Sequence, residues 1–350
     1  MTGIIEYLKR AVKANASDLF IVAGCPVSLK QDGTIDPADE TKLLPPQTEQ
    51  LISGLYTLAG RSMAGYMETH HDNFSFAVPG LARFRVGAYR QRGSMAAVVR
   101  VVTFDIPGWE KLHIPRAVME LTDLTHGLVL LTGGAGSGKS TTQACMIDRI
   151  NQTRNCHIIT LEDPIEFLHR NQKSVVSQQE VGLDVEDCLS ALHFCMWQAP
   201  DVIVLDRMED WRTIQAAVSA VQTGRLLIAI LPTKGAVGAV SHIIDSFPAA
   251  QQAQARLHLS RTLRAVVTQQ LLPGKEGGQF PAFELMRVNG EIQELIRDGQ
   301  ESEIESAVTG SNGTINMDQF ILMLYREGRI TVETALSYAN NPEQMRRRCI

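Results

Sequence analysis

The stretch Leu128-Val129-Leu130-Leu131-Thr132-Gly133-Gly134-Ala135-Gly136-Ser137-Gly138-Lys139-Ser140-Thr141 decides the fold of this chain. Its first five residues predict a buried strand, and residues 141–150 predict a helix. Between them lies the octet G-x-x-x-x-G-K-S at residues 133–140, a phosphate loop when a strand precedes it and a helix follows it. The alternative is a chance glycine-rich turn, which the complete octet with both flanks disfavours.

Each part of this loop has a predicted role in binding phosphate or Mg²⁺. The glycines let backbone N–H groups wrap around phosphates, and the start of the following helix adds a positive dipole. Lys139 is expected to reach the β- and γ-phosphates, and Ser140 to bind Mg²⁺. We therefore expect ATP and Mg²⁺ as cofactors, with these binding residues: Gly133, Gly134, Ala135, Gly136, Ser137, Gly138, Lys139, Ser140 and Thr141.

Carboxylates follow two further predicted strands. Residues 158–161 lead into Glu162 and Glu166, and residues 202–205 lead into Asp206. The carboxyl ends of parallel strands share one edge of a sheet, so these groups are expected to face the ligand. There they can hold Mg²⁺ or orient an attacking water. We predict all three as catalytic residues, and Glu162 as a metal ligand beside Ser140; the alternative is a solvated acidic loop.

The strand before Asp206 resembles a Walker B strand. The next residue is Arg207, where many NTPases place the glutamate that polarises water. A guanidinium stays protonated and cannot act as a base. Asp206 or Glu209 is a candidate substitute, but Asp206 lies one residue earlier and is expected to point to the opposite face of an extended strand.

The pattern around these strands predicts the fold class. Strand-like runs at residues 127–132, 157–161, 202–206 and 226–231 alternate with helical stretches, which indicates an α/β fold with a mainly parallel sheet. The preceding half reads as a small antiparallel sheet with flanking helices. The tail reads as helical, with breaks at Ser311-Asn312-Gly313 and at Asn341-Pro342. The predicted organisation is an N-terminal domain (residues 1–105), a linker (106–115), an ATPase core (116–290) and a C-terminal helical region (291–350).

Composition excludes several classes of protein. The chain has 350 residues, is 44% hydrophobic and 20% charged, and carries a formal net charge of −5. This balance argues against a nucleic-acid translocase, because such proteins need a basic face. None of the six cysteines forms a C-x-x-C pair, so we expect no zinc module and free thiols in a reducing cytoplasm. We also expect no signal peptide and no membrane span.

Taken together, the motifs resemble the type IV pilus retraction ATPases, the PilT-like branch of the type II/IV secretion ATPases. The similar stretches occur in the family's order and span nearly the whole chain: residues 16–19, 80–86, 89–94, the phosphate loop, 160–167, 177–182, 200–203, 263–273 and 335–342. The resemblance implies a PAS-like N-terminal domain before a RecA-like core, with ATP between them. It also implies that arginines close over the phosphates, namely Arg83, Arg85, Arg90 and Arg92; their alternative is a solvated strand face.

The resemblance further implies partners and a location. It predicts a homo-hexamer, or a mixed ring with a related ATPase, that works on an inner-membrane platform protein of the pilus. The location would be cytoplasmic, peripheral to the inner face of the cell membrane. The missing zinc module favours retraction (twitching motility) over pilus assembly. The basic end at residues 344–348 is a candidate contact for anionic lipid, or else ordinary charge placement at a helix C-terminus.

Departures from the family fall on the hydrolytic machinery. Arg207 stands where the family has its catalytic glutamate, and Arg225 and Pro232 stand where it has the two histidines of its histidine box. Further departures lie nearby: Gln179, His193, Trp197 and Ala199. Two hypotheses follow. The first is a motor that couples ATP hydrolysis to movement between domains; the second is a nucleotide-binding regulatory or structural subunit that hydrolyses ATP weakly or not at all.

Overall fold

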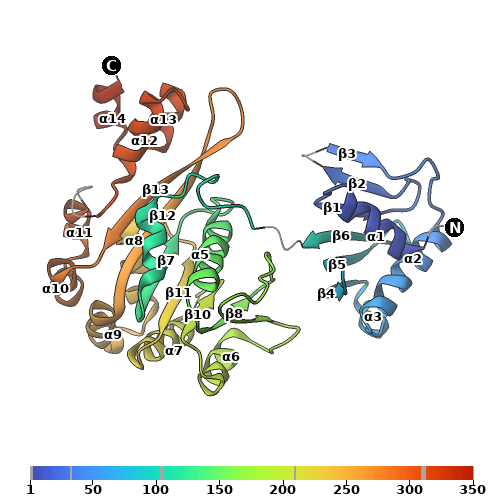
Figure 1. Ribbon diagram of the computed structural model, residues 1–350, viewed down its shortest axis with the longest axis horizontal. Coiled ribbons are helices and arrows are strands. Elements are labelled where there is room, and N and C mark those ends of the chain that lie inside the picture. Colours follow the sequence, from blue (N-terminus) through green and yellow to red (C-terminus); the bar gives the residue numbers. More distant parts are fainter. Residues whose placement is uncertain (1–2, 32–33, 103–105, 209, 309–312, 350) are drawn as a thin grey trace. The chain divides into compact units, whose positions relative to one another are not determined.

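The computed structural model describes residues 3–31, 34–102, 106–208, 210–308 and 313–349, apart from the side chain of Glu305. The chain divides into two compact units, Met1–Asp105 and Ile106–Ile350 (Figure 1). Each unit has its own hydrophobic core. None of the helices within these residues combines the length and the apolar character needed to cross a bilayer.

The N-terminal unit is a six-stranded antiparallel sheet with helices, as the sequence predicts. The strand order is β3-β2-β1-β6-β5-β4. Along β5 the side chains of Phe84, Val86 and Ala88 are buried and alternate with partly exposed ones, so one face of the strand forms the core. The elements are α1 (Ile4–Lys13), β1 (Asp18–Ile21), β2 (Ser28–Gln31), β3 (Thr34–Pro37), α2 (Pro45–Leu58), α3 (Ala64–Thr69), β4 (His71–Val78), β5 (Ala82–Gln91) and β6 (Ser94–Val102).

The edge hairpin β2–β3 has no counterpart in the sequence-based prediction. All four residues of β3 are exposed, so the strand carries no alternation of apolar and polar residues that a pattern could detect. The stretch Gln31-Asp32-Gly33 between the two strands predicts a turn from its sequence, and its residues Asp32 and Gly33 lie outside the described residues.

The C-terminal unit contains a seven-stranded sheet in the order β13-β12-β7-β11-β10-β8-β9. All neighbouring pairs are parallel except β12–β13, which is antiparallel. The predicted mainly parallel α/β architecture is therefore confirmed. The strands are β7 (Gly127–Thr132), β8 (His157–Glu162), β9 (Val175–Glu180), β10 (Val202–Leu205), β11 (Leu226–Leu231), β12 (Leu263–Pro273) and β13 (Gln279–Arg287).

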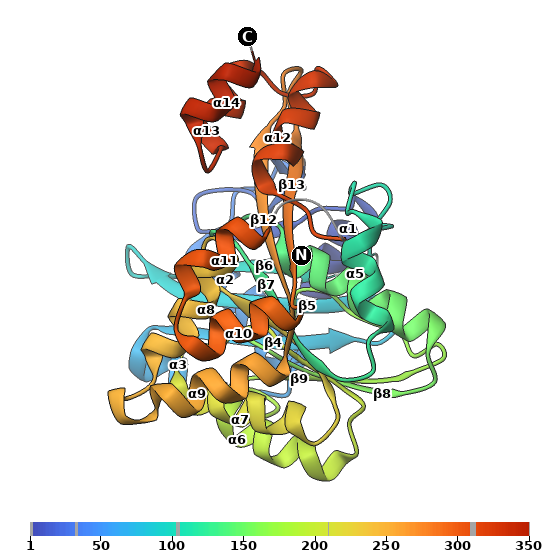
Figure 2. The same ribbon diagram turned by 90° about the vertical axis from the view of Figure 1, so that its left-hand side faces the viewer.

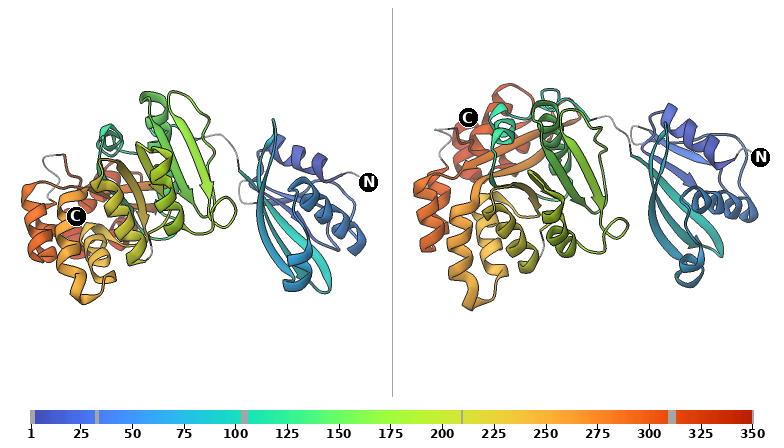
Figure 3. Two further views of the ribbon diagram at one scale, coloured as in Figure 1. Left: turned by 90° about the horizontal axis from the view of Figure 1, so that it is seen from below. Right: turned by 60° about the horizontal axis from the view of Figure 1, so that its bottom comes forward.

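Helices cover both faces of this sheet, as a parallel sheet requires. In β7, Leu128 and Leu130 pack into one core, while Val129 and Leu131 pack into the other. Figure 2 shows α8 to α11 on one side of the sheet and α5 on the other, and α9 to α11 also gather together in Figure 3. The helices are α4 (Arg116–Met119), η1 (Glu120–Asp123), α5 (Lys139–Thr153), α6 (Cys188–Cys195), η2 (Met196–Gln198), α7 (Trp211–Gln222), α8 (Gly235–Ser246), α9 (Ala249–Thr262), α10 (Gly290–Asp298) and α11 (Glu301–Ala307).

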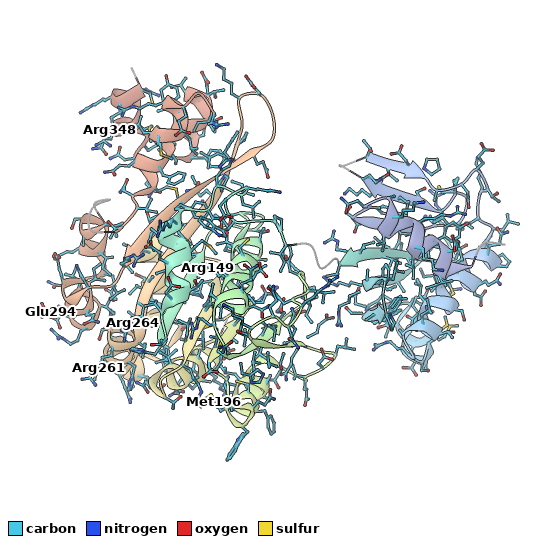
Figure 4. The ribbon with its side chains drawn as sticks, in the orientation of Figure 1. Arg149, Met196, Arg261, Arg264, Glu294 and Arg348 are labelled. Carbon is cyan, nitrogen blue, oxygen red and sulfur yellow. The ribbon has the colours of Figure 1, made fainter. Side chains whose placement is uncertain are left out.

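Helix α5 is fastened to the segment before the sheet through Arg149 (Figure 4). The Arg149 guanidinium donates to the Thr122 hydroxyl at 2.9 Å and pairs with the Asp123 carboxylate at 3.1 Å. Because α5 begins at Lys139, this anchor also fixes the helix whose first turn follows the glycine-rich loop.

Three final helices form a cluster on the β12–β13 hairpin: α12 (Met317–Arg326), α13 (Val332–Tyr338) and α14 (Pro342–Cys349). Helix α14 starts at the predicted Asn341-Pro342 break, as expected for a proline in the first turn of a helix. Of the other predicted break, Ser311 and Asn312 lie outside the described residues. The tail is helical, as predicted.

Candidate functional site

The glycine-rich loop has the backbone that its sequence predicts. It leaves the buried strand β7 and enters α5 at Lys139. Gly133, Gly136 and Gly138 have φ values of 140°, 72° and 88°, a region that side chains rarely adopt. The first N–H groups of α5 have no partner within the helix, so they are donors for an anion at this position.

Both neighbouring strands hold this loop in place. The Gly133 N–H donates to the carbonyl of Thr233, just after β11, at 2.7 Å. On the other side, the Thr142 hydroxyl donates to the buried side-chain oxygen of Gln269, on β12, at 2.7 Å. The start of the loop and the first turn of the helix that follows it are therefore each held by a neighbouring strand or the residues just after it.

The Lys139 side chain folds back across the loop. Its Nζ donates to the carbonyl oxygens of Gly133 at 3.0 Å and Gly134 at 2.6 Å. Burial lowers the pKa of the ammonium below its ordinary value, and the negative charges of Asp206 and Glu166 oppose that shift. An ammonium group that is bonded to backbone carbonyls can exchange these partners for phosphate oxygens, with which it forms stronger, charge-assisted hydrogen bonds. Ser140 and Thr141 follow it in the first turn of α5.

The pKa values of two of the predicted carboxylates lie well above the ordinary range. Burial raises the pKa of Glu162, the last residue of β8, to about 7, and hydrogen bonds from Thr160 and Gln178 oppose the shift. Burial and the nearby charge of Glu166 raise the pKa of Asp206 to about 6. Perturbed carboxylates in one place are typical of functional sites.

Asp206 comes directly after a strand, where the alternation of side chains along a strand no longer predicts which way it points. Strand β10 ends at Leu205, so Asp206 lies beyond the strand and the alternation rule does not apply to it. Its charge interacts with Lys139, Glu162 and Glu166, which puts it among the loop and the acidic groups. Arg207 is exposed and lowers the pKa of Asp206 through its positive charge. Glu209 lies outside the described residues.

A cleft of about 520 Å³ opens beside the loop. One wall consists of loop residues 133–137 with Lys234, and another consists of residues 337–340 at the end of α13. Sequence reasoning did not single out Lys234 as a site residue. No motif identifies it, because only the fold brings the start of α8 next to the loop.

The two positions of the histidine box lie at opposite ends of β11. Arg225 precedes the strand and Pro232 follows it, about 23 Å apart along an extended backbone. Pro232 stands next to Thr233, which binds the loop, whereas Arg225 donates to the hydroxyl of Thr223 at 2.5 Å. Of the two altered histidine-box positions, Pro232 is therefore the one next to the phosphate loop.

Helix α6 and the turn after it carry two other departures, His193 and Trp197. The Trp197 side chain is 89% exposed, and its neighbour Phe194 is 70% exposed. Figure 4 places Met196 of this turn and Arg348 of α14 at opposite ends of the C-terminal unit. These exposed side chains come from different elements than those lining the cleft beside the loop.

The predicted arginines belong to the N-terminal unit and do not form one cluster there. Arg83 and Arg85 alternate with the core residues of β5, so both lie on its outer face. Arg90 is exposed at the far end of β5, about 23 Å from Arg83 along the strand. Arg92 lies in the turn between β5 and β6. Their role toward a nucleotide stays a prediction.

Comparisons with known proteins agree with this geometry. Residues 3–334 match the family model described as "Type II/IV secretion system protein". The type IV pilus ATPase PilU of Pseudomonas aeruginosa is 37% identical over 97% of this chain and 90% of its own length. The "Type IV pilus retractation ATPase PilT" of the same organism is 36% identical over 97% of this chain and 99% of its own length.

A solved structure supports the same relationship. The pilus retraction motor PilT, crystallised with ADP, superposes with a TM-score of 0.91 at 38% identity, covering 99% of this chain and 100% of its own. The ATPase DotB of Legionella pneumophila shares the fold, with a TM-score of 0.81 at 22% identity over 95% of each chain. With a phosphate loop, a parallel sheet and a family match over nearly its whole length, the chain belongs to the type II/IV secretion system protein family.

Proposed function

We propose that this chain is an ATP-binding motor ATPase of a type IV pilus system, which couples ATP hydrolysis to movement of its domains during retraction. One observation carries the proposal: the phosphate loop with Lys139 lies at the same sheet edge as Glu162 and Asp206. The relatives described as pilus ATPases support it.

The nucleotide-binding part of this proposal rests on the loop. Backbone N–H groups of residues 134–141 would surround the phosphates, and Lys139 would neutralise them. The retraction motor with bound ADP, similar over its whole length, supports the nucleotide as the ligand.

The donor set at the sheet edge fits Mg²⁺. This ion takes oxygen ligands and is usually held by one or two carboxylates or hydroxyls together with phosphate oxygens. No group of three or more His, Cys, Asp or Glu side chains suited to a metal occurs among the residues that the structure describes. Phosphate oxygens of the nucleotide would supply further ligands to a cation here. Ser140 and Glu162 would hold it, and it would neutralise charge on the phosphates.

A second function deserves a test because of Arg207. If no other carboxylate replaces the missing glutamate, the chain would bind nucleotide as a regulatory or structural subunit and turn it over slowly. The loss of a positioned base typically removes about 10²–10⁴ in rate. We further propose that either form works in a ring, with itself or with a related ATPase, at a membrane-bound pilus platform.

Phosphate release by the purified protein distinguishes these functions. We expect Lys139→Ala to lose both nucleotide binding and turnover. If the wild type turns over at about 1–10³ per second, it is a motor in its own right. If the wild type binds ATP without releasing phosphate, and Arg207→Glu restores turnover, the chain is the nucleotide-binding subunit. Wild-type protein that does not bind ATP at all would reject both.

A further inference from the structure

The carboxylate of Glu162 is held by two side chains from adjacent strands. The Thr160 hydroxyl, on the same strand β8, donates to Glu162 Oε1 at 2.5 Å. The Gln178 amide, on β9, donates from Nε2 to the same oxygen at 3.0 Å. Gln178 pairs with Thr160 in the register of the two strands. The orientation of this carboxylate is therefore fixed from both sides.

The orientation of the Gln178 amide is itself determined by its other partners. Nε2 also donates to the carbonyl oxygen of Phe167 at 2.8 Å, and Oε1 accepts from the N–H of His169 at 2.8 Å. Turning the amide over would place an acceptor against the Glu162 carboxylate and the Phe167 carbonyl, and a donor against the His169 N–H. Only one orientation satisfies all three partners.

The same face of β9 holds the rest of the acidic turn. Glu180 lies two residues after Gln178, so both side chains leave the strand on the same side. Its buried carboxylate accepts from the Ile165 N–H at 3.4 Å. Gln179, between them, lies on the opposite face and donates to Gln198 at 3.3 Å. Side chains on one face of β9 thus hold residues 163–169 in place through hydrogen bonds.

We propose that Gln178 is a positioning residue: it holds the Glu162 carboxylate in the orientation in which Glu162 serves the Mg²⁺–nucleotide complex. The inference rests on the proposed function, because it assumes that the phosphate loop binds a nucleotide. Gln178 would act on the nucleotide through Glu162, while its bonds to Phe167 and His169 set the orientation of its own amide. Groups that orient a metal ligand in this way typically matter by about 10–100-fold in metal affinity or activity.

Nucleotide affinity with and without magnesium tests this assignment independently of turnover. A non-hydrolysable ATP analogue is titrated into the protein by calorimetry in MgCl₂ and in EDTA. We expect Gln178→Met to weaken binding in MgCl₂ by about 10–100-fold and to leave binding in EDTA unchanged. Gln179→Met is the matched control, because it removes the same amide from the other face of the strand, and it should bind as the wild type does.

Two further variants show that the effect passes through Glu162. In a Glu162→Gln background, Gln178→Met should cost no further affinity, because residues that act as a unit are not additive. Thr160→Val should also weaken magnesium-dependent binding, whereas Thr160→Ser keeps the donor and should not. These Thr160 variants also test the proposal if Gln178→Met fails to fold, which circular dichroism would report.

The outcomes separate this inference from the proposed function. If Lys139→Ala binds the analogue as tightly as the wild type, the proposed function fails. If Lys139→Ala abolishes binding while Gln178→Met retains the full magnesium-dependent affinity, the function stands and the role of Gln178 is wrong. A wild-type affinity that does not depend on magnesium also overturns the role of Gln178.

Discussion

Gly133 lies directly against the backbone of Gln269: a Cβ atom at Gly133 would be 2.2 Å from the Gln269 carbonyl oxygen. At the other end of the loop, a Cβ atom at Gly138 would be 2.8 Å from the side-chain amide of the same residue. Real Cβ contacts are essentially never closer than 3.0 Å. Contact with the β12 backbone therefore requires glycine at position 133 in addition to its φ value, whereas at position 138 the contact is with the end of a side chain and the φ of 88° is the main constraint.

Gly133→Ala should destabilise the protein strongly. The φ of 140° is unfavourable for alanine, and the contact with backbone cannot be relieved by a side-chain movement. We expect the free energy of unfolding, measured in urea, to fall by about 2 kcal/mol or more. Gly134→Ala is the matched control, because a Cβ there meets no atom within 4 Å. Equal stability of the two variants would contradict this account of the loop.

The sequence predicted the parts of this site that depend on local pattern. The octet, its flanking strand and helix, and the strand ends with Glu162 and Asp206 all follow from spacing and periodicity. The structure adds contacts between residues far apart in the chain: Thr142 and Gln269 are 127 residues apart, and Glu162 and Gln178 are 16 apart. No periodicity specifies such pairs, because they depend on which strands become neighbours.

The elements that escaped prediction share a physical reason. Strand β9 lies at the edge of its sheet and consists of Val175-Val176-Ser177-Gln178-Gln179-Glu180, and β3 is fully exposed. Edge strands have fewer neighbours to bury against, so their sequences carry less apolar signal. Asp206 differs from these strands, because β10 ends at Leu205 and the alternation of side chains along a strand does not determine where the next residue points.

His169 should make stability depend on pH. Burial lowers the pKa of this imidazole to about 4, below the ordinary value of about 6.5. Between pH values of about 4 and 6.5, the unfolded chain therefore binds more protons at this histidine than the folded protein does. The free energy of unfolding consequently decreases as the pH falls through this range. The shift corresponds to about 3 kcal/mol at most. Thermal melting between pH 7 and 5 measures it.

His169→Leu should remove this dependence, because an apolar side chain carries no proton into the buried position. His242→Leu, at an exposed position on α8, should leave the slope of melting temperature against pH as it is in the wild type. A His169→Leu variant with the wild-type slope would show that other groups cause the acid sensitivity.

Asp318→Ala should loosen the C-terminal helices. This nearly buried carboxylate accepts from the N–H groups of Asn340 at 2.6 Å and Asn341 at 2.9 Å, which join α13 to α14. Alanine leaves both donors without this partner, and hydrogen bonds to a charged group contribute about 1.5–3 kcal/mol each. Hydrogen exchange should become faster in residues 332–349. Glu343→Ala, exposed on α14, is the control; unchanged exchange in Asp318→Ala would refute the role of this cap.

Lys234→Ala should weaken nucleotide binding modestly and in a salt-dependent way. Lys234 is exposed and lines the cleft together with loop residues 133–137. A solvated cation attracts phosphate weakly, by about 0.2–1 kcal/mol, so the dissociation constant should rise by about two- to fivefold at most. Added salt screens such an attraction, so the wild type and the variant should converge at high ionic strength. Lys173→Ala removes an equally exposed lysine elsewhere on the unit and should bind as the wild type does. A difference in dissociation constant between the wild type and Lys234→Ala that persists at high salt would contradict this expectation. Lys234 would then contact the phosphates directly in a desolvated site, and its loss should cost as much affinity as a charge-assisted hydrogen bond provides.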